Sequence, residues 1–402
     1  MTKLPTHPVR RQLPGVLPAE YETLRERGIG QVELPTGKLV WMIVRPEYAR
    51  IVLSDPRFSS DKTDDRFPKL TPGSLKKLKY CAPFMINLDG PEHLEKKKSI
   101  IQEFSPAGLA RLMPRLRVAV EEKIDAILGQ QTKPVDLVEE LAFPIAWRLQ
   151  EMFLGIPATE LRIMRENVWK LLLGTSTEAE EREAADRLNG HAIEVLKEKA
   201  NHLGDDMMSR LIVQEREKHG EDVDWYEMAP LMLSNAQGIH NSVSTMISLG
   251  VLTLLNHPEE RPKLLADPDR MTVAVDEMLR YFSVNDGTPM RLATEDVLIG
   301  DTLIKAGDGV AVPTLPVNRD PSVCPYPHQL NLMREEPARH MAFGHGPHKC
   351  PADRLVPGLL EIVYTTLFER VPTLALAVPE AELTYKYHSI QAFGPAEMPV
   401  TW

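Results

Sequence analysis

The sequence predicts a mainly α-helical protein with small β-sheets. Helix-length apolar patterns recur at 107–129, 135–154, 158–174, 178–199 and 206–217. A long uncharged segment, Leu231 to Leu255, follows them, whereas β-type runs are short. No repeat, low-complexity tract or linker divides the 402 residues, so we expect one domain covering 1–402.

The β-type patterns begin near the N-terminus. Gln31–Leu34 and Lys38–Val44 flank Pro35-Thr36-Gly37, a turn sequence, and predict a β-hairpin. Glu47–Leu53 predicts a short helix. Residues 60–79 are polar, rich in Pro and Lys and aperiodic, which indicates a long loop.

The uncharged segment Leu231–Leu255 is long enough to span a membrane. It contains several polar side chains that would be costly in lipid, among them Asn235, His240 and Asn241. A central helix that is buried on all sides explains this composition better. We therefore expect a core helix and no membrane span.

Bulk composition narrows the function classes. Hydrophobic residues make up 43% and charged residues 26%, as in ordinary globular proteins. The net charge of −10 argues against a nucleic-acid partner. Three widely spaced cysteines do not suggest a disulfide framework, and Met1–Gly15 has no apolar run, so we expect neither signal peptide nor anchor and a cytoplasmic location.

One cysteine lies in a glycine-bearing loop. Phe343-Gly344-His345-Gly346-Pro347-His348-Lys349-Cys350 precedes a helix-patterned apolar segment, Leu355–Leu367. Backbone N–H groups of the turn and the positive end of the helix dipole would stabilise a thiolate there. Gly344 and Gly346 can adopt backbone angles closed to other residues and so allow a tight curl beneath a flat cofactor. The pattern indicates a socket for a metal held by one sulfur.

Two other interpretations of this loop are weaker. His345, His348 and Cys350 could bind zinc, but zinc usually needs a fourth ligand, and the chain has no CxxC or HxxxH pair. The glycines could begin a dinucleotide-binding loop. Residue 349, where its third glycine would fall, is lysine, and no βαβ pattern surrounds it.

Phe343 to Ala352 matches Phe-Gly-x-Gly-x-His-x-Cys-x-(Gly/Ala) at every defined position. This is the haem-binding signature of the cytochrome P450 haem-thiolate monooxygenases, and the chain resembles their soluble bacterial branch. The resemblance implies a triangular helical domain around a buried haem b (iron protoporphyrin IX), with a long central helix. It implies Cys350 as axial iron ligand, because a thiolate pushes electron density that favours O–O cleavage. Phe343 and Gly344 would lie beside the sulfur, and His348 would meet a haem propionate.

Other segments resemble the family's propionate contacts. Asp89-Gly90-Pro91-Glu92-His93 is similar to Asp-Pro-Pro-Glu-His, which would place His93 at a propionate. Lys97 stands where relatives usually carry arginine and can neutralise charge but cannot bind bidentately. Arg291 matches the third propionate cation. Each charge taken singly would ordinarily be a solvated surface group.

A structural triad is also implied. Glu277 and Arg280 match the family's Glu-x-x-Arg helix, and Arg334 follows at the expected distance. The three would form a buried ion network that is costly to break when one member is lost. Alone, a glutamate and an arginine at this spacing would more often be a solvated pair.

The central helix departs from the family pattern. Relatives usually carry Ala-Gly-x-(Asp/Glu)-Thr, whose acid and alcohol supply protons for dioxygen activation. Here the register gives Gly238 but places His240 at the acid and Asn241 at the threonine. His240 could supply protons or could be a packed core histidine. Asn241 could position a water but cannot relay a proton as a hydroxyl does. We expect all three to be catalytic residues.

By the same resemblance, the walls of the substrate pocket are mainly apolar with a few amides. Such walls suit a medium-sized aromatic or peptide-like molecule, although core packing would explain most of these residues equally well. The expected lining residues are Phe84, Met85, Ile86, Trp169, Leu173, Leu233, Gln237, Val284, Asn285, Ile390, Gln391 and Phe393.

The resemblance implies a monomeric oxidoreductase that uses dioxygen to oxidise a secondary metabolite, with electrons from a ferredoxin and ferredoxin reductase. His240 and Asn241 motivate an alternative, oxidative C–C or C–N coupling of aromatic units, for example of an indole-containing cyclic dipeptide, without oxygen insertion. A non-catalytic haem-binding protein is the alternative from another class.

Overall fold

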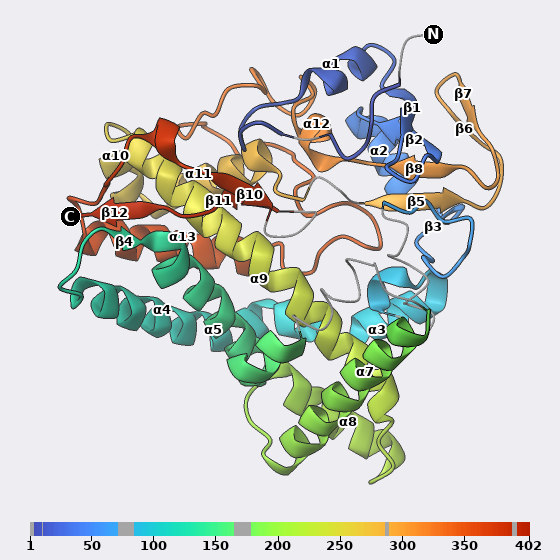
Figure 1. Ribbon diagram of the computed structural model, residues 1–402, viewed down its shortest axis with the longest axis horizontal. Coiled ribbons are helices and arrows are strands. Elements are labelled where there is room, and N and C mark those ends of the chain that lie inside the picture. The colour runs from blue at the N-terminus through green and yellow to red at the C-terminus, as the bar shows by residue number, and fades with distance from the viewer. Residues whose placement is uncertain (1–3, 10, 71–83, 165–177, 286–288, 388–391) are drawn as a thin grey trace.

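A computed structural model describes residues 4–9, 11–70, 84–164, 178–285, 289–387 and 392–402 (Figure 1). Helices dominate and the sheets are small, which confirms the predicted fold class. Among the described residues the helices include α1 Ala19–Arg25, α2 Pro46–Ser54, η2 Met85–Asn87, α3 Gly90–Ile101, η3 Gln102–Phe104, α4 Pro106–Leu128, η4 Val138–Ala142, α5 Phe143–Leu154, α7 Glu178–Asn201, α8 Met207–His219, α9 Trp225–Asn256, α10 Arg261–Leu265, α11 Pro268–Phe282, α12 Thr314–Asn318, α13 Leu355–Arg370 and η5 Glu380–Glu382, and residues 158–164 are also helical.

The central helix predicted from the uncharged segment is α9. Asp224 caps its N-terminus by accepting a hydrogen bond from the backbone N–H of Glu227, at 3.0 Å. α9 runs diagonally through the middle of the molecule, with α5, α7 and α13 packed against it (Figure 1). It is long and apolar enough to cross a membrane, yet 78% of its most apolar window is buried. It is therefore a core helix, as its polar residues predicted.

α9 and α13 approach closely at Gly250. A Cβ at this position would lie 1.9 Å from the hydroxyl oxygen of Tyr364, so no larger residue fits without a shift. The Tyr364 hydroxyl donates to the carbonyl oxygen of Met246 at 2.6 Å. Because α13 directly follows the cysteine loop, this contact ties that loop to the central helix.

A five-stranded sheet of order β1-β2-β8-β5-β3 lies at the upper right in Figure 1. The predicted hairpin is present, with Ile29 opposite Ile43 and Glu33 opposite Leu39. The smaller sheets are β4-β12-β9, β6-β7 and β10-β11. The strands are β1 Ile29–Glu33, β2 Leu39–Ile43, β3 Phe58–Ser59, β4 Val135–Asp136, β5 Met290–Ala293, β6 Val297–Ile299, β7 Thr302–Ile304, β8 Gly309–Ala311, β9 Ala375–Leu376, β10 Tyr385–Tyr387, β11 Phe393–Pro395 and β12 Pro399–Thr401.

Candidate active site

The loop ahead of Cys350 is a tight turn closed by its own backbone. The N–H of Cys350 donates to the carbonyl oxygen of Phe343 at 2.9 Å. Gly344 and Gly346 have φ of +74° and +72°, as the sequence predicted for a curled loop. A Cβ at Gly346 would lie 2.2 Å from the carbonyl oxygen of Leu53, whereas one at Gly344 would meet nothing within 4 Å. Gly346 is thus required by its φ and by a backbone contact, and Gly344 by its φ.

The Cys350 residue is accessible to solvent, but protein atoms surround its thiol closely enough that burial raises the thiol pKa. The backbone N–H of Ala352 opposes this rise by donating a hydrogen bond to the sulfur, Asp353 adds to it, and the ammonium groups of Lys97 and Lys349 oppose it. A metal ion at the sulfur would deprotonate the thiol outright. Among the described residues, the Cys350 sulfur has no His, Cys, Asp or Glu cluster beside it that could add further metal ligands.

The zinc alternative lacks a ligand set. Within the part of the chain that the structure describes, no three His, Cys, Asp or Glu side chains gather closely enough to hold a metal ion. His348 is instead paired with Asp89, and its Nε2 lies 3.5 Å from Oδ1 of that carboxylate.

Imidazole and cationic side chains gather beside the cysteine loop. The rings of His93, from α3, and His348, from the loop, lie 3.9 Å apart between centroids. Arg291, on β5, is only 6% exposed and its guanidinium donates to the carbonyl oxygen of Met290 at 2.8 Å. Among the described residues, Arg291 forms no ion pair within salt-bridge distance. The structure thus brings together three of the predicted propionate contacts.

Asp89 is the carboxylate of this cluster, and its oxygens are already occupied. They accept hydrogen bonds from the backbone N–H of Ser60, at 2.9 and 3.1 Å, and from the Ser59 hydroxyl at 2.5 Å. Burial acts to raise the pKa of Asp89, but hydrogen bonds from His348, Ser59 and Ser60 outweigh it and lower that pKa to about 2. Asp89 therefore carries a full negative charge near neutral pH.

Burial lowers the pKa values of the basic groups in this cluster. Burial lowers the pKa of His93 to about 4, and the charges of His348 and Lys97 act in the same direction. Burial also lowers the pKa of His348, and it lowers that of Arg291 to about 10. Positive charge is costly here chiefly because the groups are buried, and the nearby carboxylate of Asp89 opposes this cost only in part. A ligand with two carboxylates would remove that cost, so this donor set fits the two propionates of haem.

The contacts of Lys97 and the surroundings of Lys62 differ from what the sequence predicted for these two lysines. The Lys97 amino group donates to the carbonyl oxygen of Lys349 at 3.1 Å and to that of Pro347, so it binds the cysteine loop. Lys62 lies near Arg291, and its pKa is lowered to about 8 by burial and by the Arg291 charge. Nothing in the sequence singled out Lys62, because a lysine in a polar loop is ordinarily solvated.

The structure brings the three predicted triad residues into contact. Arg280 binds Glu277 through two hydrogen bonds of 2.7 and 2.8 Å, and Nε of Arg334 lies 2.8 Å from Oε2 of Glu277. Glu277 and Arg280 are almost fully buried. The guanidinium of Arg280 also donates to the carbonyl oxygens of Asn318 and Pro327, which fixes the chain that leads to the cysteine loop.

The predicted catalytic residues, Gly238, His240 and Asn241, lie within about one turn of α9. The His240 ring is buried, nearly parallel to Phe143 at 5.1 Å and 4.1 Å from Trp147 between centroids, and both aromatic rings belong to α5. This placement favours the packed-histidine alternative. Asn241 is also buried. A Cβ at Gly238 would meet none of the described atoms within 4 Å, so among these residues this glycine leaves room beside the helix.

The predicted pocket residues are only partly described. Trp169, Leu173, Ile390 and Gln391 lie outside the described residues, and so does the side chain of Gln237. Both η2 and β11 pack against α9, which brings Met85 and Phe393 to the central helix.

The remaining pocket residues differ in exposure. Leu233 is buried, Phe84 and Val284 are half-buried against the core, and Ile86 is exposed. The backbone carbonyl oxygen of Asn285 accepts a hydrogen bond from the Thr314 hydroxyl at 2.8 Å.

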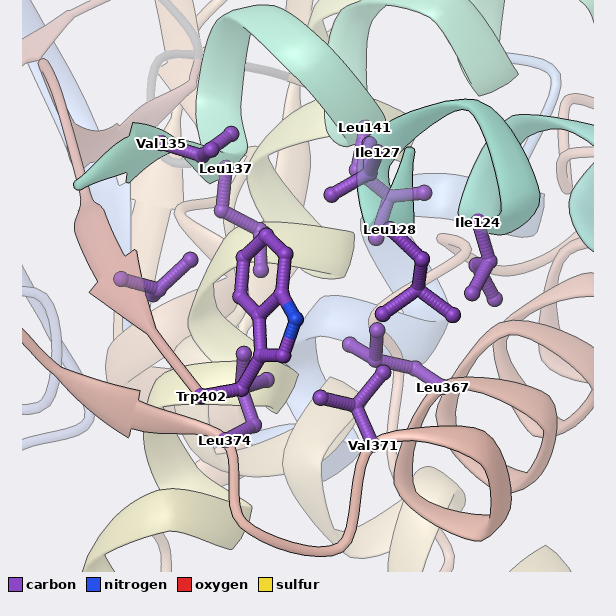
Figure 2. A pocket seen from close by; sticks show the side chains of 11 residues that line it. Ile124, Ile127, Leu128, Val135, Leu137, Leu141, Leu367, Val371, Leu374 and Trp402 are labelled. Atoms are coloured by element: carbon purple, nitrogen blue, oxygen red, sulfur yellow. The ribbon is translucent and has the colours of Figure 1, made fainter. Parts of the chain in front are cut away.

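A cavity of about 10 Å³ lies elsewhere, between α4, α13 and the β4-β12-β9 sheet (Figure 2). It has room for about one water molecule, and its walls are entirely apolar, so it is a packing gap in the core. None of its lining residues is a predicted site residue. They are Ile124, Ile127, Leu128, Val135, Leu137, Leu141, Leu367, Val371, Leu374, Val400 and Trp402.

Comparisons with a family model, with curated proteins and with solved structures all match cytochrome P450 proteins. A family model described as cytochrome P450 matches residues 150–370. The chain is 35% identical to pentalenic acid synthase of Streptomyces avermitilis, over 98% of this chain and 96% of that protein. The crystal structure of cytochrome P450 MoxA from Nonomuraea recticatena is 39% identical, with a TM-score of 0.85 and 98% of each chain covered. The mycinamicin VIII C21 methyl hydroxylase MycCI from Micromonospora griseorubida is 28% identical, with a TM-score of 0.88 over 99% of this chain and 100% of that one.

Proposed function

The chain belongs to the cytochrome P450 family of haem-thiolate monooxygenases, and from that membership we propose that it uses dioxygen to oxidise a small secondary metabolite. The observation that carries the proposal is the Cys350 thiol, held in a glycine turn beside a cluster of imidazole and cationic side chains whose carboxylate, Asp89, is already engaged. The pentalenic acid synthase and the mycinamicin VIII hydroxylase, by their names, act on molecules of this general class.

The residues divide the binding of haem b among them. Cys350 would ligate the iron, and Phe343 and Gly344 would lie beside the sulfur. His93, Arg291 and His348 would bind the propionates. The Lys97 amino group would hold the cysteine loop in place by donating to the carbonyl oxygens of that loop. When bound, the haem supplies dioxygen activation.

α9 would form one wall of the substrate pocket. Gly238 leaves room beside the helix, and the amide of Asn241 can donate and accept hydrogen bonds, so it could position a water or a substrate group. His240 would hold α9 against α5 through Phe143 and Trp147. Met85 and Phe393 make the neighbouring surface apolar, which supports an aromatic or peptide-like substrate.

A second candidate reaction is oxidative coupling of aromatic units without oxygen insertion. Two features favour it: an amide stands where relatives carry a hydroxyl, and the neighbouring imidazole packs between rings of α5. Both features weaken the proton supply that oxygen insertion needs. For either reaction we propose that electrons come from a ferredoxin and its reductase in the cytoplasm, and that the chain works as a monomer.

Turnover under labelled dioxygen separates these proposals. Candidate aromatic metabolites and cyclic dipeptides are first selected by the low-spin to high-spin shift of the haem. Each is then supplied with ferredoxin, reductase and NAD(P)H. Label in the product supports monooxygenation, and an unlabelled dimer or ring-closed product supports coupling. A haem-loaded chain that binds none of them and gives no product would be a non-catalytic haem binder.

A further inference from the structure

Lys62 adds a cation to the cluster around Arg291. It follows β3 on the segment whose Ser59 and Ser60 donate hydrogen bonds to Asp89. β3 pairs with β5, with Ser59 opposite Leu292, so the two strands carry Lys62 and Arg291 into the same region. The charge of Arg291 acts directly on the Lys62 ammonium group.

Neither Lys62 nor Arg291 has a carboxylate partner among the described residues. Arg291 is almost fully buried, and within the described residues its guanidinium donates to the backbone carbonyl of Met290 alone. Lys62 forms no hydrogen bond or ion pair within the described part of the chain. The nearby carboxylate, Asp89, is occupied by Ser59, Ser60 and His348. Arg291 is buried and Lys62 is partly buried, and two neighbouring cations in such surroundings are costly unless an anion joins them.

The other candidates for a propionate partner do not supply a second charge. The Lys97 ammonium group is engaged with the carbonyl oxygens of Pro347 and Lys349. The rings of His93 and His348 lie 3.9 Å apart between centroids, and Nε2 of His348 lies 3.5 Å from Oδ1 of Asp89, so Asp89 already matches the charge that this pair can carry. Lys62 and Arg291 remain as two positive charges, which matches the two negative charges of the haem propionates.

We propose that Lys62 binds a haem propionate together with Arg291 and neutralises the charge that Lys97, engaged with the cysteine loop, leaves unpaired. The inference rests on the proposed function, because it requires that the chain bind haem. It assigns a role to a residue outside the sequence motifs.

The test compares haem-loaded wild type with Lys62→Met, which keeps length but removes the charge, and with Lys62→Arg, which keeps the charge. We expect Lys62→Met to transfer ferric haem to excess apomyoglobin about tenfold faster, because a charge-assisted hydrogen bond is lost. Its ferric/ferrous midpoint potential should fall, since a positive charge near the propionates favours the reduced, more electron-rich state. Lys62→Arg should stay within about twofold of wild type.

Lys69→Met serves as the matched control, because it removes a positive charge from the same segment, near Lys38. It should change neither quantity. Unchanged haem transfer and potential in Lys62→Met would overturn the proposal. So would a change confined to the binding of anionic substrates, which would make Lys62 a substrate contact. A wild-type chain that takes up no haem would instead contradict the proposed function, so the two failures are distinguishable.

Discussion

The imidazole rings of His93 and His348 lie 3.9 Å apart between centroids, although one comes from α3 and the other from the loop ahead of Cys350. The contact seats the N-terminal turn of α3 against the cysteine loop. Burial lowers the pKa of both rings, so both are neutral near pH 7 and can act as hydrogen-bond donors without adding charge.

Acidification should destabilise the haem-free fold through this histidine pair. An unfolded histidine titrates near 6.5, whereas the folded pKa of His93 is about 4 and that of His348 is lowered in the same direction. Below about pH 6.5 the unfolded chain binds more protons than the folded chain, so the free energy of unfolding falls as pH decreases towards about 4. We expect a loss on the order of 1 to 2 kcal/mol between about pH 7 and about pH 5, measured by urea unfolding.

The control for this pH dependence is a double variant, His93→Gln with His348→Gln, which keeps polar side chains that do not titrate. Its free energy of unfolding should vary less steeply with pH over the same range. A pH dependence as steep as that of wild type would show that other groups cause it.

Glu277→Gln should be strongly destabilising. The substitution leaves Arg280 and Arg334 without the carboxylate that neutralises them, and Arg280 is fully buried. Removing one partner of a buried pair costs about 3–5 kcal/mol. We expect little soluble, haem-containing protein, whereas Glu259→Gln, at an exposed position, should yield as much as wild type. Wild-type thermal stability in Glu277→Gln would refute a structural role for the triad.

The two loop glycines offer a matched pair of substitutions. Both have positive φ, so alanine at either costs roughly 1–2 kcal/mol. Only at Gly346 would the new Cβ also collide with the carbonyl oxygen of Leu53. Gly346→Ala should therefore lower the thermal stability of the haem-free chain far more than Gly344→Ala, as measured by circular dichroism. Equal losses would mean that the Leu53 contact does not shape the loop.

His240 is expected to tolerate phenylalanine. A phenyl ring would fill the space against Phe143 and Trp147, so His240→Phe should keep the wild-type thermal stability. His240→Ala should lose about 2–4 kcal/mol because it leaves a cavity. If His240→Phe stays folded and haem-loaded but its product yield per NAD(P)H collapses, then His240 supplies protons and the packing interpretation is wrong.

Local sequence signals predicted most helices because apolar period and capping are local properties. The helix expected at 107–129 is α4, Pro106–Leu128, and Ser105 caps it by accepting from the N–H of Gly108. The helix expected at 206–217 is α8, Met207–His219, capped by Asp206. These ends needed no knowledge of the tertiary structure.

The prediction of a single helix over 135–154 was wrong for its first residues. Val135–Asp136 is a strand, Val138–Ala142 is a π-helical turn, and α5 begins at Phe143. Val135 pairs with Val400 near the far end of the chain. A helix-type pattern cannot reveal such a distant partner, which decided the structure here.

The distinction between local patterns and contacts of distant segments also applies to the site. The cysteine loop could be predicted because its motif is contiguous. The placement of Lys62 depends on β3 pairing with β5, and that of the Lys97 amino group on carbonyl oxygens of a distant loop. The orientation of His240 depends on aromatic rings of α5. Each requires contacts between elements that no local pattern specifies.

Carbon monoxide binding to the reduced protein tests the central claim most directly. With Cys350 as thiolate ligand, the ferrous carbon monoxide complex should show the strongly red-shifted Soret band that sulfur ligation produces. Cys350→His should keep haem but show an unshifted band typical of nitrogen ligation. A wild-type chain without the red-shifted band, or a Cys350→His variant that retains it, would contradict the assignment of Cys350 as the iron ligand.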